Sequence, residues 1–326
     1  MDATSIRSAL WMLVGAVSFA VMGGLTHALG SRCDWLIVAL TRAIFMLGSA
    51  WLLAASAGVR LVVFRPPTLW IRSLAGSVSL VCNFYAMSIL PVADALTLMS
   101  MYPLWIVVFS ALWLRRMPSV LEVGGVICGL IGVVLMQRPH LGGDSQAVAI
   151  AIASSLTTAV ALMGLHRLRH VDTRAVVAHF AGVASVIAGG WLLVQVSNGA
   201  LHGIRLDVLT LTLLLGVAIS GTLGQFCLTR AYALGVPARV AVIGLSQVAF
   251  AMIFDVWVWG RVLTPLTVLG MAFVLAPTAL MTTQARRRLR DVALPSRTTR
   301  VPASPEPVAN PAPPPALPIA APSGGD

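Results

Sequence analysis

The stretch RMPSVLEVGGVICGLIGVVLM, residues 116–136, recurs 145 residues later as RVLTPLTVLGMAFVLAPTALM, residues 261–281. Two unrelated apolar helices share Leu and Val by chance, but they seldom share an Arg, a Gly and a closing Leu-Met at one offset. The sequence therefore predicts an internal repeat. The identical pairs, seven in 21 positions, are Arg116/Arg261, Leu121/Leu266, Val123/Val268, Gly125/Gly270, Leu130/Leu275, Leu135/Leu280 and Met136/Met281.

The composition indicates a membrane protein. Of the 326 residues, 58% are apolar and 10% are charged, whereas soluble proteins carry about 25% charged residues. The net charge of +11 is carried by arginine alone, with 22 basic residues and no lysine. Most of these arginines stand at the ends of apolar runs, and they are not gathered in one domain. A nucleic-acid partner is therefore not predicted.

Ten apolar runs are long enough to cross a bilayer, which takes roughly 17–25 helical residues. The first run is longer than the apolar core of a typical signal peptide, so we interpret it as a membrane helix. No run shows the strict alternation of a strand. The runs are 9–29, 35–57, 69–90, 93–114, 119–137, 147–166, 174–196, 208–229, 238–259 and 264–284.

The distribution of arginine predicts the orientation of these helices. With the N-terminus in the cytoplasm, 17 arginines lie in cytoplasmic segments and four, namely Arg32, Arg138, Arg205 and Arg261, lie outside. Arg42 lies within a helix. Because cytoplasmic loops are enriched in basic residues, we predict a multi-pass protein of the cell inner (plasma) membrane with both termini cytoplasmic.

The 145-residue offset extends beyond the opening stretch, since it also aligns Ala93 with Ala238 and Phe109 with Phe254. Each repeat then holds five helices, and an odd number inverts the second repeat in the membrane. The predicted fold is an all-α integral membrane protein of ten transmembrane helices in two inverted five-helix repeats, 1–140 and 147–285. Residues 291–326 hold ten of the 19 prolines and are predicted to form a disordered cytoplasmic tail.

Inverted repeats have a functional consequence. Two such halves are related by a pseudo-two-fold axis in the membrane plane, and an exchange of their conformations converts an inward-open shape into an outward-open one. This is the structural basis of alternating access, with the substrate near the midplane between the repeats. The repeat therefore favours a transporter.

Two longer stretches carry a resemblance to a known family. They are YAMSILPVADALTLMSMYPLWIVVFSALWLRRMPS, residues 85–119, and TRAYALGVPARVAVIGLSQVAFAMIFDVWVWGRVLTP, residues 229–265. With the Gly-containing helix after each, they resemble the repeat ending of the drug/metabolite transporter superfamily, specifically permeases with two EamA-type repeats. The resemblance implies a central cavity and the export or uptake of small metabolites. Members commonly carry Gly-Glu before the last helix of a repeat, where this chain has Arg115-Arg116 and Gly260-Arg261.

Polar side chains within the predicted helices are candidates for substrate binding, because such residues usually face the bundle interior or a wet cavity. The alternative is hydrogen bonding between helices, worth about 0.6–2 kcal/mol each. The repeat aligns Tyr102 with Gln247, so we expect these two on corresponding walls of the cavity. The candidates are Asn83, Tyr85, Tyr102, Trp105, Gln225, Ser246 and Gln247.

Charged residues within or near the helices are candidates for coupling or charge pairing: Arg42, Asp94 and Asp255. Arg42 is expected to pair with Asp34 or Asp94, with binding of an anionic substrate group as the alternative. Asp255 is expected to pair with Arg261 or simply to lie at the membrane interface, with proton coupling as the alternative.

Further charged groups are given structural roles. Glu122 stands beside Arg115 and Arg116 and is expected to pair with them. His166 and His170 are four residues apart, but two histidines flanked by arginines make a poor metal site. Neither a metal site nor a cofactor is predicted.

The sequence thus predicts a permease for a small neutral or zwitterionic metabolite, such as an amino-acid-like compound, and not an enzyme. Two alternatives stay open: a membrane enzyme that modifies lipids, and a receptor or scaffold that uses the proline-rich tail. The predicted partners are a small-molecule substrate and membrane lipids, and a homodimer is left open.

Overall fold

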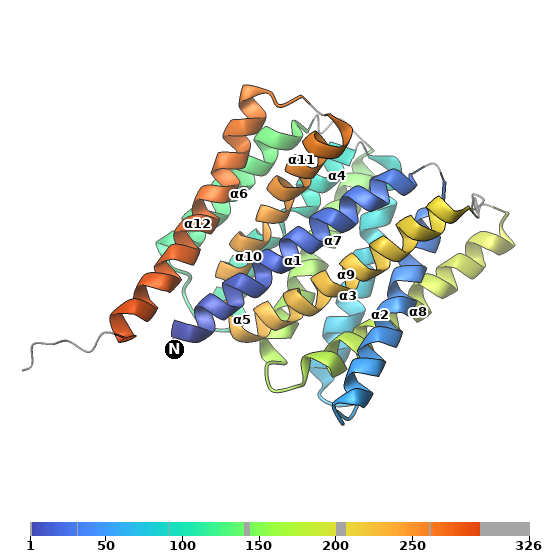
Figure 1. Ribbon diagram of the computed structural model, residues 1–326, viewed down its shortest axis with the longest axis horizontal. Coiled ribbons are helices and arrows are strands. Elements are labelled where there is room, and N and C mark those ends of the chain that lie inside the picture. Colours follow the sequence, from blue (N-terminus) through green and yellow to red (C-terminus); the bar gives the residue numbers. More distant parts are fainter. Residues whose placement is uncertain are drawn as a thin grey trace, which may run out of the picture.

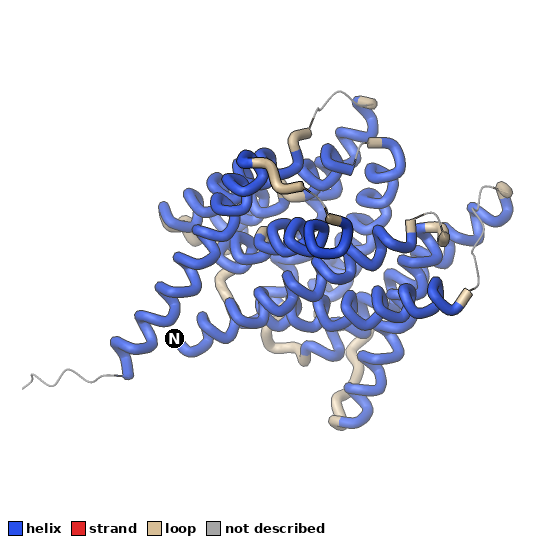
Figure 2. The backbone as a smooth tube through the Cα atoms, turned by 45° about the horizontal axis from the view of Figure 1, so that its top comes forward, coloured by secondary structure: helices blue, strands red, loops and turns tan. Residues whose placement is uncertain are grey.

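The computed structural model describes residues 2–30, 32–90, 92–139, 144–199, 207–260 and 262–293. These residues form helices joined by short turns, with no strand among them (Figures 1 and 2). The helices are α1 (Asp2–Leu29), α2 (Trp35–Ser56), α3 (Pro67–Ile89), α4 (Val92–Met99), α5 (Tyr102–Trp113), α6 (Val120–Gln137), α7 (Ser145–Arg167), α8 (Thr173–Ser197), α9 (Val208–Leu234), α10 (Pro237–Gly244), α11 (Ser246–Trp259) and α12 (Pro265–Ala293).

Within the described residues, nine segments are long and apolar enough to cross a membrane. Two of them join consecutive short helices, α4 with α5 and α10 with α11. The predicted third span is helical as α3 but is not among the nine. An all-α, multi-pass membrane protein is therefore confirmed, while ten crossings and the inverted repeat remain predictions.

The two ends of the described chain differ from the predicted limits. Helix α12 continues to Ala293, so the first three residues of the predicted disordered tail, 291–293, are helical. The rest of that tail lies outside the described residues. The start of α1 and the end of α12 lie on the same side of the bundle in both views (Figures 1 and 2). We call this side the terminal face.

The main helix pairs each combine one helix from the first half of the chain with one from the second half. Helix α1 lies along α9, and α3 lies along α7. Helix α2 packs against α8, and α6 packs against α12 (Figure 1). Each half of the chain therefore forms its main contacts with the other half.

The two short-helix pairs break at equivalent places. Helices α4 and α10 are both eight residues long and begin at Val92 and Pro237, 237 − 92 = 145 residues apart. In the first pair Pro103 has no backbone N–H to donate to the preceding turn, and in the second pair Gly244 weakens the helix. Helix α10 starts on Pro237 as expected for a first-turn proline.

Small residues allow α6 and α12 to approach closely. A Cβ atom added to Gly132 would lie 2.6 Å from the carbonyl oxygen of Gly270, and one added to Gly270 would lie 2.7 Å from that of Gly132. No side chain fits at such distances from backbone, so the two glycines set the separation of these helices.

On the face opposite the terminal face, an ion pair ties the α1–α2 turn to the start of α9. Arg32 Nη1 lies 2.9 Å from Asp207 Oδ2. The side chain of Asp207 also accepts a hydrogen bond from the backbone N–H of Thr210 as the helix cap. Hydrogen bonds from Thr210, with the charge of Arg32, lower the pKa of Asp207.

Candidate functional site

The two helix breaks meet in the interior. Tyr102 is the first residue of α5, and its hydroxyl lies over the last residue of α10. A Cβ atom added to Gly244 would lie 2.7 Å from that hydroxyl oxygen. The breaks of the two halves are therefore in direct contact, and glycine is what permits it.

Two polar residues follow the second break, Ser246 and Gln247. The hydroxyl of Ser246 is buried and donates to the carbonyl of Ile243 at 2.6 Å. Gln247 is half-buried, and its amide has no hydrogen-bond partner among the described residues. Gln247 thus offers a donor and an acceptor beside the break.

Aromatic residues with polar groups surround Tyr102. Trp105 donates through Nε1 to the Ser155 hydroxyl at 2.9 Å, which links α5 to α7. Tyr232 of α9 is fully buried in the same cluster, and its hydroxyl has no partner within the described part of the chain. Sequence reasoning missed Tyr232, although a Tyr inside an apolar helix was the available signal.

The remaining polar candidates lie on α3 and α9. Asn83 accepts a hydrogen bond from the Ser154 hydroxyl, between α3 and α7, which matches the helix–helix alternative. Tyr85 is half-buried on α3. Gln225 is 5% exposed within α9. These three residues are not joined to the helix breaks by any described hydrogen bond.

Arg42 does not make the ion pair predicted for it. No carboxylate of a described residue lies within salt-bridge distance of Arg42, so the pairing with Asp34 or Asp94 is wrong. Asp34 instead caps α2 by accepting from the N–H of Leu36 at 2.8 Å, and Asp94 is buried at the start of α4. The Arg42 guanidinium carbon lies 5.9 Å from the centre of the Phe19 ring.

The surroundings of Arg42 have a counterpart in the other half. Arg42 lies over Gly221 of α9, where an added Cβ would be 2.8 Å from Nε. In the other half Phe180 of α8 lies over Gly76 of α3, where an added Cβ would be 3.0 Å from Phe180 Cε2. Gly76 and Gly221 are 221 − 76 = 145 residues apart. Arg72 Nη1 lies 3.5 Å from the same Cβ position at Gly76 and its guanidinium carbon lies 3.8 Å from the centre of the Phe180 ring, so each notch combines an arginine with a phenylalanine.

Asp255 is half-buried on α11. Its predicted partner, Arg261, lies outside the described residues. Proton coupling and charge pairing both remain predictions for Asp255.

A buried ion pair lies near the terminal face. Glu122, 1% exposed, accepts from Arg239 Nε at 2.7 Å and lies 3.4 Å from Arg116 Nη2. The pairing with Arg116 was predicted and is confirmed, but the shorter contact with Arg239 of α10 was missed. Because 117 residues separate Glu122 from Arg239, no local sequence pattern predicts this contact.

Glu122 also starts its helix. Its Oε2 accepts from the backbone N–H of Ser119 at 3.0 Å, and the Ser119 hydroxyl accepts from the N–H of Glu122 at 3.3 Å. This reciprocal capping box fixes the first turn of α6. The other carboxylate oxygen is left to bind Arg239.

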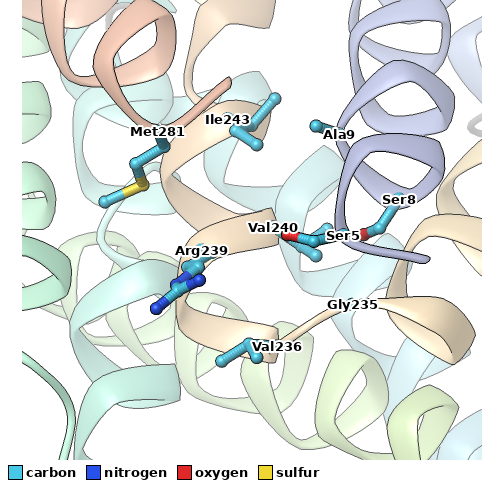
Figure 3. Close-up of a pocket in the computed structure, with 9 residues that line it drawn as sticks. All are labelled: Ser5, Ser8, Ala9, Gly235, Val236, Arg239, Val240, Ile243 and Met281. Atoms are coloured by element: carbon cyan, nitrogen blue, oxygen red, sulfur yellow. The ribbon is translucent and has the colours of Figure 1, made fainter. Parts of the chain in front are cut away.

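The terminal face is closed around this ion pair. Helix α10 packs against α5 and α6, and α1 packs against α12. A cavity between α1, α10 and α12 measures about 20 Å³ (Figure 3), which is room for about one water. It is lined by Ser5, Ser8, Ala9, Gly235, Val236, Arg239, Val240, Ile243 and Met281.

At the opposite face one helix is less tightly joined. By the 145-residue spacing, α4 corresponds to α10, α11 to α5, and α12 to α6. Over the described ranges, α4 makes no comparable packing contact with α11 or with α12. The difference concerns α4 alone: it lacks counterparts of the contacts that α10 makes with α5 and α6 of the other half, while Arg32–Asp207 and the hydrogen bond from Arg138 to Thr264 join the halves at this face.

The described residues contain no group of three or more His, Cys, Asp or Glu side chains placed to hold a metal ion. Cys33, Cys82, Cys128 and Cys227 are free thiols. Outside the spans, burial raises the pKa of the Cys33 thiol, with a further contribution from the charge of Asp34.

Comparison with known proteins gives a consistent result. Residues 6–138 match the EamA-like transporter family. The chain is 27% identical over 280 residues to the pseudopaline exporter CntI of Pseudomonas aeruginosa, covering 84% of this chain and 96% of that protein. It is 26% identical over 209 residues to an uncharacterized transporter of Helicobacter pylori, covering 63% of this chain and 69% of that protein.

The fold is also similar to a solved crystal structure. The two share a TM-score of 0.71 at 19% identity, over 86% of this chain and 98% of the other. At this identity the likeness concerns the fold alone.

Proposed function

Since the chain belongs to the EamA-type permeases of the drug/metabolite transporter superfamily, we propose that it moves a small metabolite across the inner membrane by alternating access between its two halves. The relatives are transporters, which favours this function over the lipid-modifying enzyme and the scaffold.

The observation that carries the proposal is the pair of matched helix breaks. Discontinuous membrane helices at a repeat interface expose backbone groups and polar side chains near the midplane, where many transporters bind substrate. Here the breaks touch through Tyr102 and Gly244, with Gln247 beside them. We assign the substrate site to this junction.

The unequal contacts of α10 and of its counterpart α4 with the other half support a two-state mechanism. The terminal face, where α10 meets α5 and α6, is the cytoplasmic one by the arginine distribution. The described arrangement then corresponds to an outward-facing state with a closed cytoplasmic side. An exchange of the halves' shapes would open the cytoplasmic side and close the other.

For the substrate we propose a zwitterionic, amino-acid-like metabolite. Arg42 provides a positive charge within the membrane, its buried Nε has no hydrogen-bond partner among the described residues, and charged residues in this setting mark substrate pathways. A carboxylate is the complementary group. Tyr102 and Gln247 provide neutral hydrogen-bonding groups at the helix breaks, whereas Arg42 lies on α2, which packs against α8 and α9. A relative at 27% identity is an exporter of pseudopaline.

Transport by purified protein in liposomes tests the proposal. A panel of amino acids, their N-substituted derivatives, neutral sugars and organic cations is measured with and without a pH gradient. We expect saturable transport of a carboxylate-bearing class, weakened in Gln247→Ala. Transport confined to organic cations would contradict the substrate class, and the absence of any transport by folded protein would contradict the permease. Deletion of residues 294–326 is the control, because a permease tolerates it and a tail-dependent scaffold does not.

A further inference from the structure

A groove of about 590 Å³ runs between α2, α3, α8 and the turn that joins α2 to α3. Its lining is almost entirely apolar and includes none of the residues at the helix breaks. Representative lining residues are Leu47, Leu61, Trp70, His179, Gly182 and Ile187. The groove is therefore separate from the proposed substrate site.

The depth of the groove matches one leaflet of the bilayer. Along α8 it extends from Ala175, near the start of the helix at the terminal face, to Ile187. These 12 residues rise about 18 Å at 1.5 Å per residue, against roughly 15 Å for half of a hydrocarbon core. Val186, at the far end, is 75% exposed, so the groove faces the surroundings of the bundle and not its interior.

The mouth of the groove carries positive charge. Leu61, Val62 and Val63 line it, and they stand between Arg60 and Arg65, both exposed. An apolar turn flanked by arginines suits the membrane interface, where the side chains of arginines reach the headgroups.

A histidine holds this turn in place. His179 Nε2 donates to the carbonyl of Val63 at 3.1 Å, while Nδ1 accepts from the Ser73 hydroxyl at 2.8 Å. Trp70 packs edge-on against the same ring, with centroids 4.7 Å apart. The turn is thereby fixed to both α3 and α8, so contacts within the protein alone hold the mouth of the groove in shape.

We propose that this groove binds an anionic phospholipid of the cytoplasmic leaflet. One acyl chain occupies the groove, and the phosphate is bound by Arg60 and Arg65. Three features point to this ligand: an apolar channel one leaflet deep, its opening to the outside of the bundle, and two arginines at the headgroup level. A bound lipid would join α2 to α8, which pack against each other from opposite halves of the chain.

Two kinds of variant test the contact with the lipid headgroup and the contact with the acyl chain separately. Arg60→Ala with Arg65→Ala removes two cations, each worth about a factor of five near a membrane surface, so lipid affinity is expected to fall about 30-fold. Gly182→Leu fills the groove, since the nearest atom to an added Cβ is Leu47 Cδ1 at 3.9 Å. We expect Gly182→Leu to abolish saturable lipid binding.

Each variant has a matched control. Arg7→Ala removes an exposed arginine at the start of α1, outside the groove. Gly190→Leu makes the same change two turns further along α8, where an added Cβ meets nothing within 4 Å. Both controls should bind lipid as the wild type does.

The measurement is native mass spectrometry of delipidated protein titrated with dioleoylphosphatidylglycerol or dioleoylphosphatidylcholine in detergent, with the melting temperature as a second readout. Wild type should retain phosphatidylglycerol preferentially and be stabilised by it. Equal retention of the two lipids by wild type, or undiminished phosphatidylglycerol binding by Gly182→Leu, would overturn the proposal. If Gly182→Leu does not fold, the double arginine variant still decides, because unchanged lipid preference there contradicts the assigned headgroup contact. The assay involves no transport, so it is independent of the proposed permease activity.

Discussion

The ion pair between Glu122 and Arg239 should hold the terminal face, which we propose to be the cytoplasmic side, closed, and Glu122→Gln is the change that tests it. Glutamine retains an oxygen for the capping box with Ser119, since Gln also serves at this position. The substitution therefore removes the negative charge and leaves the start of α6 intact. What is lost is the attraction to Arg239 at 2.7 Å and to Arg116 at 3.4 Å.

The magnitude follows from burial. The Glu122 side chain is 1% exposed, while Arg239 and Arg116 are 30% and 44% exposed. A fully buried pair loses about 3–5 kcal/mol when one partner is removed, and an exposed pair contributes about 0–1 kcal/mol. Because the carboxylate is buried and the two arginines are partly exposed, we expect Glu122→Gln to remove about 2 kcal/mol of stabilisation, between these limits. It corresponds to a shift of roughly 30-fold in the equilibrium between closed and open cytoplasmic sides.

Cysteine labelling measures that shift. Ile243 lines the small cavity at the closed face and is 3% exposed, so Ile243→Cys reports opening once the four native cysteines are replaced. In inside-out vesicles we expect a membrane-impermeant maleimide to label this position about 30 times faster when Glu122→Gln is present, because labelling follows the open population when opening is fast.

Ser119→Ala is the matched control, since it weakens the same helix start by about 1 kcal/mol but keeps the ion pair. Its labelling rate should stay near that of the parent. If Glu122→Gln and Ser119→Ala raised the rate equally, the effect would come from the helix start, and the ion pair would have no gating role. An unchanged rate in Glu122→Gln would refute the reasoning directly.

Three further substitutions have defined outcomes. Gln247→Ala should raise the transport KM at least several-fold while leaving the melting temperature near that of wild type, because its half-buried amide has no described protein partner; this is measured by liposome uptake and thermal unfolding. Arg42→Phe copies a residue found at the equivalent notch of the other half, so it should fold normally yet lose transport of carboxylate-bearing substrates, and normal transport would contradict the assigned role. Gly132→Ala places a methyl group 2.6 Å from the carbonyl oxygen of Gly270, so it should lower the melting temperature by several degrees, equivalent to about 1–3 kcal/mol of overpacking.

The sequence predicts the membrane class and most helix positions because both follow from composition and run length. Charged residues are expensive in lipid, so apolar runs bounded by arginine have few alternative explanations. The breaks within two spans were harder to predict. Pro103 signals one of them, but Gly244 and Ser246 are common inside membrane helices and give no clear sign of the other.

The polar contacts were predicted less well, because they depend on neighbours distant in sequence. Tyr102 and Gln247 both lie beside the helix breaks, while their place on the walls of a substrate cavity stays a prediction. The pairing of Arg42 with Asp34 or Asp94 failed because a position near the same membrane face does not fix the direction of a side chain. Glu122 was given a local partner, and its closer partner is Arg239.

The 145-residue spacing assigns the Glu122–Arg239 ion pair a counterpart in which only one residue is charged. Subtracting 145 from Arg239 gives Asp94, and adding 145 to Glu122 gives Thr267; both are buried. If the halves exchange shapes, Asp94 approaches Thr267 when the outer side closes. At the inner side the corresponding residues, Arg239 and Glu122, carry opposite charges. A hydrogen bond to one charged group contributes less than a buried ion pair that is also hydrogen-bonded. The substrate-free protein should therefore favour the outward-facing state, and substrate binding must supply the free energy that opens the cytoplasmic side.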